Sequence, residues 1–453
     1  MRNLFTLSLS LFFAGAMAIG QTEGTTAAAS DFAAAYQQFS FDLYQNVEKK
    51  LTQEAEPQNV VVSPLSAWFA LSMLQQGANT NTLDCINQTL RLPEGSQGLA
   101  LYNSQLISDL LKPCEWTDWG EGGEKPVLEL ANGLWTDDLI TCLDKYKDSL
   151  SICYGAECSQ LDLQLQESLD EVDVWVNEKT HGTIPSLNIL PSEELLMLLV
   201  NALYFKGSWE MGADEGITED RPFYSSTGEA RNVPTIYFEG PLNYGVNEEF
   251  QTVRMWFGQD HRFSMTFFLP QGDTRLTSET YNQAIQSLGV LGGASLWLPR
   301  FTIDADFYMT EALEEMGMAQ VFSSGADFSR MTENPIWVSF VKQLSHIAVD
   351  EKGVEASAVT VIGAEMSIPG PKQVTIDHPF YFSLEDNLCN KVMFIGHIVT
   401  LGNGNVQGIS SHETSLRTSP DVVCDLSGRR QPTQDKGLNV VRQGGNPRIV
   451  FVK

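Results

Sequence analysis

The chain has 453 residues, of which 43% are hydrophobic, and its 57 acidic against 28 basic residues give a formal net charge of −29. This length suits two or three average domains, or one large mixed fold with a continuous core. The negative charge argues against binding to nucleic acid or to anionic membranes, because both repel an acidic surface.

The first twenty residues are predicted to be a secretory signal peptide. Arg2 precedes an apolar run from Leu4 to Ala14, and the small-residue pattern Ala16-Met17-Ala18 follows. Such a run is too short and wrongly flanked to anchor a protein in a membrane. We therefore expect residues 1–20 to be removed and the mature chain to be secreted, with no membrane span.

Two helices are predicted in the next part of the chain. Residues 31–47 place apolar side chains such as Phe32, Tyr36 and Phe39 at three- and four-residue spacing. Residues 63–78, SPLSAWFALSMLQQGA, begin with Ser63 as a cap and Pro64 in the first turn, and continue almost wholly apolar. We expect this second helix to be buried at the centre of the fold.

The middle of the chain mixes strand-like and helical patterns. Residues 195–209, 263–270 and 294–309 are predicted to form strands, several of them apolar on both faces. Because helices and strands do not alternate regularly, a doubly wound parallel sheet is not indicated and an α+β fold is expected.

Seven cysteines are an odd and sparse set for a secreted chain of this length. Their spacing fits no zinc pattern, because Cys153 and Cys158 have no partner pair and no neighbouring histidine. Isolated buried thiols are the favoured interpretation, with a Cys153–Cys158 or Cys142–Cys153 disulfide as the alternative.

The sequence carries no enzymatic signature. None of the six histidines lies in an HExxH motif, a GxSxG motif or a phosphate-binding loop. Adjacent carboxylates such as Glu314 and Glu315 would point about 100° apart on a helix. We therefore expect no catalytic residues, no metal site and no cofactor.

Residues 350–371, DEKGVEASAVTVIGAEMSIPGP, form a long stretch of small and apolar side chains in an acidic protein. Read as a strand, one face of it carries Val354, Ala356, Ala358, Thr360, Ile362 and Ala364. Small side chains suit a loop that is exposed in one state and enters a sheet in another, and Pro369 ends the pattern. An ordinary buried strand is the alternative, although it would pack poorly.

This segment resembles the reactive loop of the serpins, a family of protease inhibitors. Its hinge would comprise Glu351, Gly353, Val354, Glu355, Ala356, Ser357, Ala358 and Thr360. The stretch VTIDHPFYFSL, from Val374 to Leu384, matches the family signature, and NALYFKGSWE and NKVMFIGHIVTL are also similar to serpin segments. The matches run in family order from Phe32 to Leu401, so residues 30–402 are expected to form one serpin domain.

The resemblance implies a large central, mostly antiparallel sheet, two smaller sheets, about nine helices and an exposed reactive loop. A target protease would cut this loop and be trapped while the loop inserts into the central sheet. The residues implied in opening that sheet are Ser63, Ser66, Asn201, Trp209 and Gln343. Two positions depart from the family pattern, since Val354 replaces the usual threonine or serine and Gln343 a frequent histidine.

Two positions are open for the bond that the protease would cut. The usual family spacing gives Ser367–Ile368, whereas a loop shorter by one residue gives Met366–Ser367. We favour Met366–Ser367, because MSIP is similar to an inhibitory serpin loop and methionine fills hydrophobic pockets.

The expected targets are serine proteases of elastase-like, chymotrypsin-like or subtilisin-like specificity, with papain-like cysteine proteases as an alternative. Trypsin-like enzymes are disfavoured, because no arginine or lysine lies between Lys352 and Lys372. A monomer is expected. A serpin that does not inhibit, and instead acts as a binding or carrier protein, is the alternative function.

The composition changes after Leu401, where seven basic and four acidic residues follow. Residues 403–420 are predicted to be a linker, and residues 421–453 three short strands with a turn at Gly444-Gly445. The motifs DLSGRR and KGLNVV resemble the C-terminal sorting segments of the bacterial type IX secretion route. They predict a bacterial protein sent to the cell surface or beyond, and a plain β-hairpin extension is the alternative.

Overall fold

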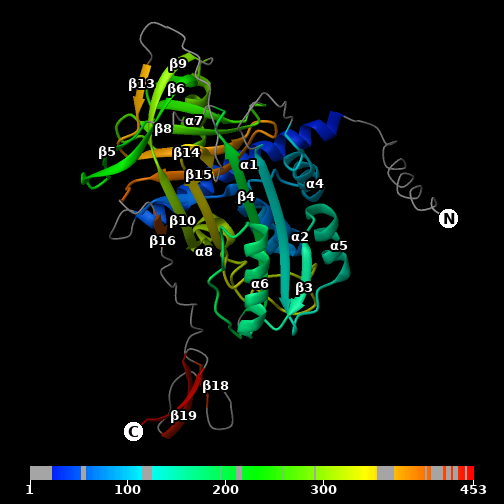
Figure 1. The fold of residues 1–453 in the computed structure, drawn as a ribbon. Helices are drawn as coiled ribbons and strands as arrows, with labels where there is room; N and C mark the ends of the chain where they lie inside the picture. The colour runs from blue at the N-terminus through cyan, green and yellow to red at the C-terminus, as the bar shows by residue number, and fades with distance from the viewer. Residues whose placement is uncertain are drawn as a thin grey trace, which may run out of the picture.

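The computed structural model describes residues 23–52, 58–114, 125–193, 195–210, 217–258, 260–289, 292–354 and 372–402, and short strands between residues 406 and 452. Over these residues the chain forms eight α-helices and three sheets (Figure 1). The helices are α1 (Glu23–Thr52), α2 (Pro64–Gly77), α3 (Thr80–Thr89), α4 (Leu99–Leu110), α5 (Asp144–Tyr154), α6 (Gln166–Lys179), α7 (Ser278–Ser287) and the short α8 (Thr310–Leu313).

The central sheet is mostly antiparallel, as expected. Only its two outermost pairs, β2 with β3 and β10 with β16, are parallel. In spatial order its strands are β16 (Val406–Ile409), β10 (Phe301–Tyr308), β11 (Lys342–Val349), β12 (Gly353–Val354), β4 (Met197–Ser208), β2 (Val127–Asp137) and β3 (Glu157–Leu161).

The two smaller sheets that were expected share one long strand and form a continuous nine-stranded sheet. Residues 230–242 of β6 pair with β5 and β9, and residues 243–246 of β6 pair with β7. The strands are β1 (Val60–Val62), β15 (Lys391–Ile398), β14 (Phe380–Asp386), β8 (Phe263–Pro270), β7 (Phe250–Phe257), β6 (Ala230–Val246), β9 (Gly292–Pro299), β13 (Lys372–Thr375) and β5 (Thr218–Tyr224).

Helix α2 is buried at the centre of the molecule, as the sequence predicts. The Ser63 side chain caps it by accepting a hydrogen bond from the Ser66 amide, and Pro64 occupies its first turn. The helix packs against β4 of the central sheet and β15 of the nine-stranded sheet, and Trp68 and Phe69 on it are fully buried. Burial of each such side chain contributes about 1.5–3 kcal/mol to folding. The N-terminus of α2 is thereby fixed behind the central sheet.

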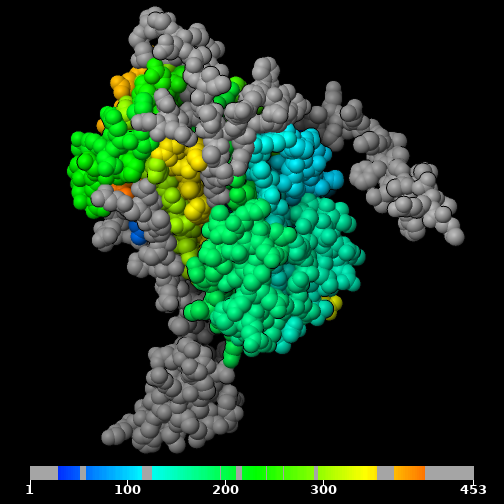
Figure 2. Space-filling model, in the orientation of Figure 1, coloured from blue at the N-terminus to red at the C-terminus, as the bar shows by residue number. Residues whose placement is uncertain are grey.

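Helix α6 covers the other face of the central sheet. Leu169, Val172 and Val176 of this helix form a separate apolar cluster with Trp135 of β2 and Leu198 of β4. In the space-filling view, α6 and the residues around it form the lower part of the visible face (Figure 2). The central sheet therefore lies between α2 and α6.

Most predicted elements agree with the structure. Helix α1 contains residues 31–47, β8 spans residues 263–270, and β9 and β10 divide residues 294–309 between them. The signal peptide and residues 355–371 lie outside the described residues, and with them lie Glu355, Ala356, Ser357, Ala358, Thr360, Met366, Ser367 and Ile368.

The C-terminal part contains more strands than the sequence indicates. Within the expected linker, β16 pairs with β10 at the edge of the central sheet. Beyond it, four strands rather than three form a separate sheet in the order β18-β17-β19-β20. They are β17 (Val422–Cys424), β18 (Arg430–Gln431), β19 (Gly437–Gln443) and β20 (Asn446–Val452).

Three further observations concern the described residues alone. Cys85, Cys114, Cys142, Cys153, Cys158 and Cys389 are free thiols. None of the helices among these residues is long and apolar enough to cross a membrane. Within the same residues, no group of three or more histidine, cysteine or acidic side chains could hold a metal ion.

Candidate functional site

The central sheet has a gap between β4 and β11. The two strands are joined at one end by β12, where Val354 lies opposite Gly207 of β4 and Val349 of β11. Beyond Val354, no strand in the described part of the chain lies between them. Within the described residues, the sheet therefore begins a further strand at Gly353 and does not continue it beyond Val354.

The turn that leads into β12 is tightly held. The Asp350 carboxylate accepts hydrogen bonds from the amides of Lys352 (2.8 Å) and Gly353 (3.1 Å). Gly353 has a φ of +148°, and a Cβ there would lie 2.0 Å from the Gly207 carbonyl oxygen. Only glycine fits this position.

Trp209 anchors the same turn from the end of β4. Its indole Nε1 donates to the Asp350 carbonyl oxygen at 3.0 Å, and its amide donates to the Lys352 carbonyl oxygen at 2.9 Å. The indole ring stacks on Phe257, with 4.4 Å between the ring centroids. One residue thus connects β4, the turn and the nine-stranded sheet.

Glu351 ties the turn to the nine-stranded sheet by charge. It forms an ion pair with Arg300, which lies between β9 and β10, and accepts a hydrogen bond from Thr218 Oγ1 at 2.8 Å. Burial alone would raise the pKa of this carboxyl group, but the hydrogen bonds from Arg300 and Thr218 outweigh it and lower the pKa. Glu351 is therefore ionised at neutral pH.

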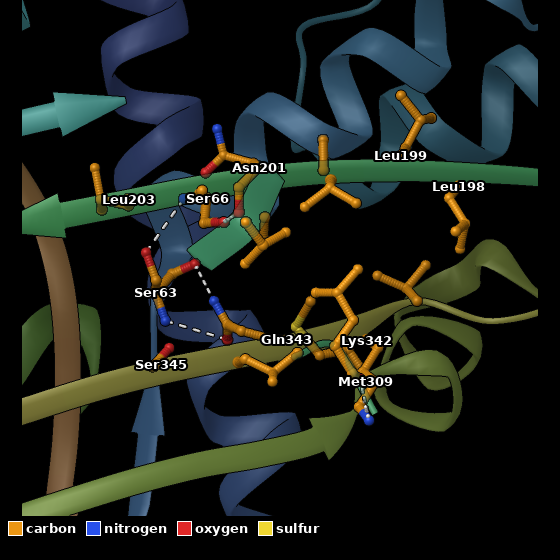
Figure 3. Close-up of a pocket in the computed structure, with 18 of the residues that line it drawn as sticks. Ser63, Ser66, Leu198, Leu199, Asn201, Leu203, Met309, Lys342, Gln343 and Ser345 are labelled. Atoms are coloured by element: carbon orange, nitrogen blue, oxygen red, sulfur yellow. Dashed lines mark hydrogen bonds between the residues drawn. The ribbon is translucent and has the colours of Figure 1, made fainter. Parts of the chain in front are cut away.

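A second cluster of polar residues bridges the gap further along the sheet (Figure 3). The side-chain amide of Gln343 on β11 donates to the Ser63 carbonyl oxygen at 2.9 Å and accepts from the Ser63 amide at 3.2 Å. Ser63 Oγ donates to the Met393 carbonyl oxygen on β15 at 3.0 Å. Gln343 cannot ionise, so this link does not titrate.

The other side of this cluster reaches β4. Ser66 Oγ donates to the Asn201 carbonyl oxygen at 3.2 Å, and Asn201 Nδ2 donates to Asn132 Oδ1 on β2 at 2.7 Å. The first turn of α2 is therefore bound to β11 through Ser63 and to β4 through Ser66. These hydrogen bonds fix the positions of β4 and β11 relative to each other on either side of the gap.

A cavity of about 90 Å³ occupies the gap itself. Its lining includes α2 residues on one face of the sheet, such as Ala67 and Leu71, and residues that follow α6 on the other face, such as Leu187. Two of the residues that line it carry buried atoms, Asn201 Oδ1 and Ser345 Oγ, for which the described residues provide no hydrogen-bond partner. An unsatisfied buried polar group costs about 1–3 kcal/mol, so a segment that filled the gap and supplied donors would stabilise the sheet.

The described residues that the sequence predicts for the hinge and for sheet opening form two groups along the gap between β4 and β11. Ser63, Ser66, Asn201 and Gln343 meet in the polar cluster at α2. Trp209, Glu351, Gly353 and Val354 meet at the turn that begins β12.

Three residues with defined contacts here were missed by sequence reasoning: Arg300, Asn132 and Lys342. For Asn132, the only signal available was a polar residue within the apolar strand LELANGLW. Arg300 and Lys342 stand in mostly apolar stretches, LWLPRFTI and WVSFVKQL, and their partners are distant along the chain.

Comparison with known proteins is consistent with this geometry. A family model described as "Serpin (serine protease inhibitor)" matches residues 34–401. Iripin-8 of the tick Ixodes ricinus is 32% identical over 367 residues, which cover 76% of this chain and 88% of Iripin-8.

Two solved structures illustrate the likeness of fold. The thermophilic serpin tengpin in its native state has a TM-score of 0.71 and 25% identity, covering 81% of this chain and 93% of tengpin. The complex of thyroxine-binding globulin with thyroxine has a TM-score of 0.70 and 23% identity, covering 81% of this chain and 98% of the globulin.

Proposed function

Because the chain belongs to the serpin family, whose members are generally protease inhibitors, we propose that it inhibits a protease by trapping it after one cut in the reactive loop. The observation that carries this proposal is the strand β12, which starts in line with an open gap in the central sheet. Released by cleavage, the residues after Val354 would continue β12 into that gap.

The pairing of β12 sets the register of the proposed insertion. Val354 lies opposite Gly207 and Val349, so an antiparallel continuation on both sides brings Thr360 opposite Asn201 and Gln343. The same register brings Ala358 opposite Leu203 and Ser345. Val354, Ala356, Ala358 and Thr360 would then share the face that points toward α2.

The chemistry of this face supports the proposal. Alanine side chains are small enough for the narrow space above α2, and the Thr360 hydroxyl can donate to the unpaired Asn201 Oδ1. Insertion would also supply backbone partners to the facing edges of β4 and β11. Each such hydrogen bond contributes about 0.5–1.5 kcal/mol, so the inserted state would be far more stable than the uncut one.

Trapping would follow from this energy difference. The protease serine attacks the carbonyl carbon of the residue before the cut, the peptide bond breaks and an ester joins the two proteins. If insertion precedes hydrolysis of the ester, the protease is pulled along the sheet with its active site distorted. No side chain of the inhibitor needs to act as a catalyst.

The proposed bond is Met366–Ser367, with Ser367–Ile368 as the alternative. A methionine before the cut favours elastase-like, chymotrypsin-like or subtilisin-like serine proteases, with papain-like cysteine proteases as a further class. The signal-like residues 1–20 and the sorting-like motifs DLSGRR and KGLNVV support a secreted or bacterial cell-surface location for this encounter.

The test mixes the purified protein with elastase, chymotrypsin, subtilisin, trypsin and papain, and analyses the products on denaturing gels. We expect a band near the summed masses with at least one of the apolar-specific serine proteases. Mass spectrometry of the released fragment should show Ser367 as its first residue. Cleavage within residues 355–371 without such a band, for every protease, would overturn the proposal and favour the binding or carrier function.

A further inference from the structure

The chain leaves the nine-stranded sheet at a fixed place, just beyond β15. The Asn59 side chain accepts hydrogen bonds from the amides of Val399 (2.8 Å) and Thr400 (3.1 Å) and donates to the Thr400 carbonyl oxygen at 2.9 Å. The Ser226 amide donates to the Val399 carbonyl oxygen at 2.9 Å, and Leu401 is only 3% exposed. Because Asn59 is itself buried, these contacts give the end of the nine-stranded sheet a defined position. The segment that follows therefore starts from an anchored point.

The next described strand, β16, lies beside the outer edge of β10 (Figure 1). Its residues Val406–Ile409 pair in parallel with Thr302–Ala305, and only residues 402–405 separate it from Leu401. The match to the family model ends at residue 401. Strand β16 therefore extends the central sheet with residues that lie beyond the family-matched part of the chain.

Strand β10 has the properties of an edge with which another chain can pair. It is eight residues long, and each of them pairs with β11 in one unbroken register. Buried and half-buried side chains alternate along it, and its sequence FTIDADFY contains no lysine and no proline. Bulges, lysine and proline are common means by which natural edge strands avoid pairing with other chains. The outer edge of β10 has none of these protections.

The two acidic residues of β10 do not replace them, because both interact with β11. An oxygen of Asp304 lies 2.6 Å from Nδ1 of His346, and Asp306 forms an ion pair with Lys342 at 2.9 Å. Both partners belong to β11, the inner neighbour of β10. The charges are therefore engaged on the side away from the outer edge.

The opposite edge of the same sheet, β3, is protected by its own sequence. This strand has five residues, and Glu157, Ser159 and Gln160 on it are exposed. Glu157 also forms an ion pair with Lys179 of α6 at 2.8 Å. A short, polar and charged edge strand is a poor template for another chain. Of the two edges, only the one formed by β10 needs a cover.

We propose that β16 is a protective edge strand, which keeps the protein monomeric by preventing a second copy of this chain from pairing with the outer edge of β10. The short connection from Leu401 gives β16 an effective concentration at β10 on the order of 1 mM. A second copy at about 1 μM is about a thousandfold more dilute, so the internal strand is favoured. This inference does not rest on the proposed inhibition.

The test disrupts β16 in the full chain with the double substitution Gln407→Pro/Gly408→Pro. Successive amides of a strand point to opposite sides, so one of two adjacent prolines removes a hydrogen bond to β10. The matched control is Thr414→Pro/Ser415→Pro, which lies between β16 and β17. Sedimentation velocity at about 100 μM protein measures the oligomeric state. Amide hydrogen exchange of residues 301–308 measures how well the edge is covered.

We expect the β16 variant to self-associate, with a weight-average mass about twice that of wild type or more. About two amides among residues 302–305 should lose protection, because every second amide of β10 faces β16. Wild type and the control should stay monomeric. Association of the β16 variant should strengthen in high salt, since salt screens the repulsion between copies that each carry a net charge of −29.

If the proline variant folds poorly, a chain that ends at Gly402 and lacks β16 is compared with one that ends at Ser411 and keeps it. The first should self-associate and the second should not.

A disrupted or deleted β16 that leaves the protein monomeric would overturn the proposal, whether or not exchange in β10 changes. Equal self-association of wild type and the control would contradict it as well. Protease trapping by the same proteins at high dilution should be unchanged, because β10 and β11 separate β16 from the gap. Failure of every protein, wild type included, to trap a protease would count against the proposed function and not against the protective strand.

Discussion

Lys391 is a buried lysine whose ammonium lies near two tyrosine rings. The residue is 4% exposed, and its Nζ lies 4.9 Å from the ring centroid of Tyr36 and 6.0 Å from that of Tyr102. Burial lowers the pKa of Lys391 to about 8. Attraction to the tyrosine faces offsets only part of the desolvation.

Lys391→Met is therefore expected to stabilise the native protein at neutral pH. Below pH 8 the lysine is charged in both the folded and the unfolded state, so the full penalty applies; it disappears as the pH rises toward 10.5. We expect a gain of roughly 3 kcal/mol in the free energy of unfolding at pH 7, since the pKa falls from 10.5 to about 8 and one pKa unit corresponds to about 1.4 kcal/mol.

Chemical denaturation at pH 7 and pH 10 measures this gain, with the exposed Lys112→Met as control. A gain that is equal at both pH values would contradict the assigned cause.

Glu351 gives a second residue-scale prediction, with the opposite pH dependence. Its pKa is lowered in the folded state, so its contribution to stability is present above the ordinary carboxyl pKa and is lost as the pH falls through the lowered value. Because the pair with Arg300 is partly exposed, Glu351→Gln should cost only about 1 kcal/mol at pH 7.

Thermal unfolding between pH 3 and pH 7 should show the wild-type and Glu351→Gln curves converging toward acid. Curves that stay parallel over this range would show that Arg300 does not stabilise the charged form.

At the scale of elements, β12 has only two residues, but it occupies the first position of the strand that the proposed insertion would extend between β4 and β11. Val354 is 1% exposed between β4 and β11. A charged side chain at this position would have to leave the sheet or be buried without a partner, and either outcome opposes insertion.

We expect Val354→Glu to be cut by the target protease and to release it. The trapped fraction should fall at least tenfold, which corresponds to about 1.4 kcal/mol. Val246→Glu, at a valine that is 51% exposed, is the matched control and should trap normally. Trapping by Val354→Glu at the wild-type level would show that residue 354 need not remain in the sheet.

Much of the fold could be predicted from the sequence, because α2 and β8 carry local signals. Ser63 and Pro64 mark the start of α2, and the apolar run of β8 is continuous. The link between Ser63 and Gln343 joins residues 280 positions apart, and neither side chain shows its partner in its own neighbourhood. For the same reason the roles of Ser63, Asn201 and Gln343 at the gap were implied only by the family resemblance, and Arg300 and Lys342 were missed.

At the scale of the whole molecule, the gap makes the described fold incomplete as a sheet. Insertion of about twelve residues would add backbone hydrogen bonds along both edges, together on the order of 10 kcal/mol.

Cutting the loop with a protease that is not trapped should therefore raise the unfolding temperature by more than about 10 °C. Differential scanning calorimetry before and after cleavage makes this comparison. An unchanged unfolding temperature would mean that the cut loop stays outside the sheet.

The position of Val354 also has a consequence in time. A strand that already has its first pair needs no search for its place, and small β-structures zip on the scale of about 1–10 μs. Proteases turn over at about 1–1,000 s⁻¹, so an ester lasts about a millisecond or longer. Insertion could therefore be about a hundredfold slower than this and still precede hydrolysis of the ester. Within this margin, sequence variation can change the insertion time without releasing the protease.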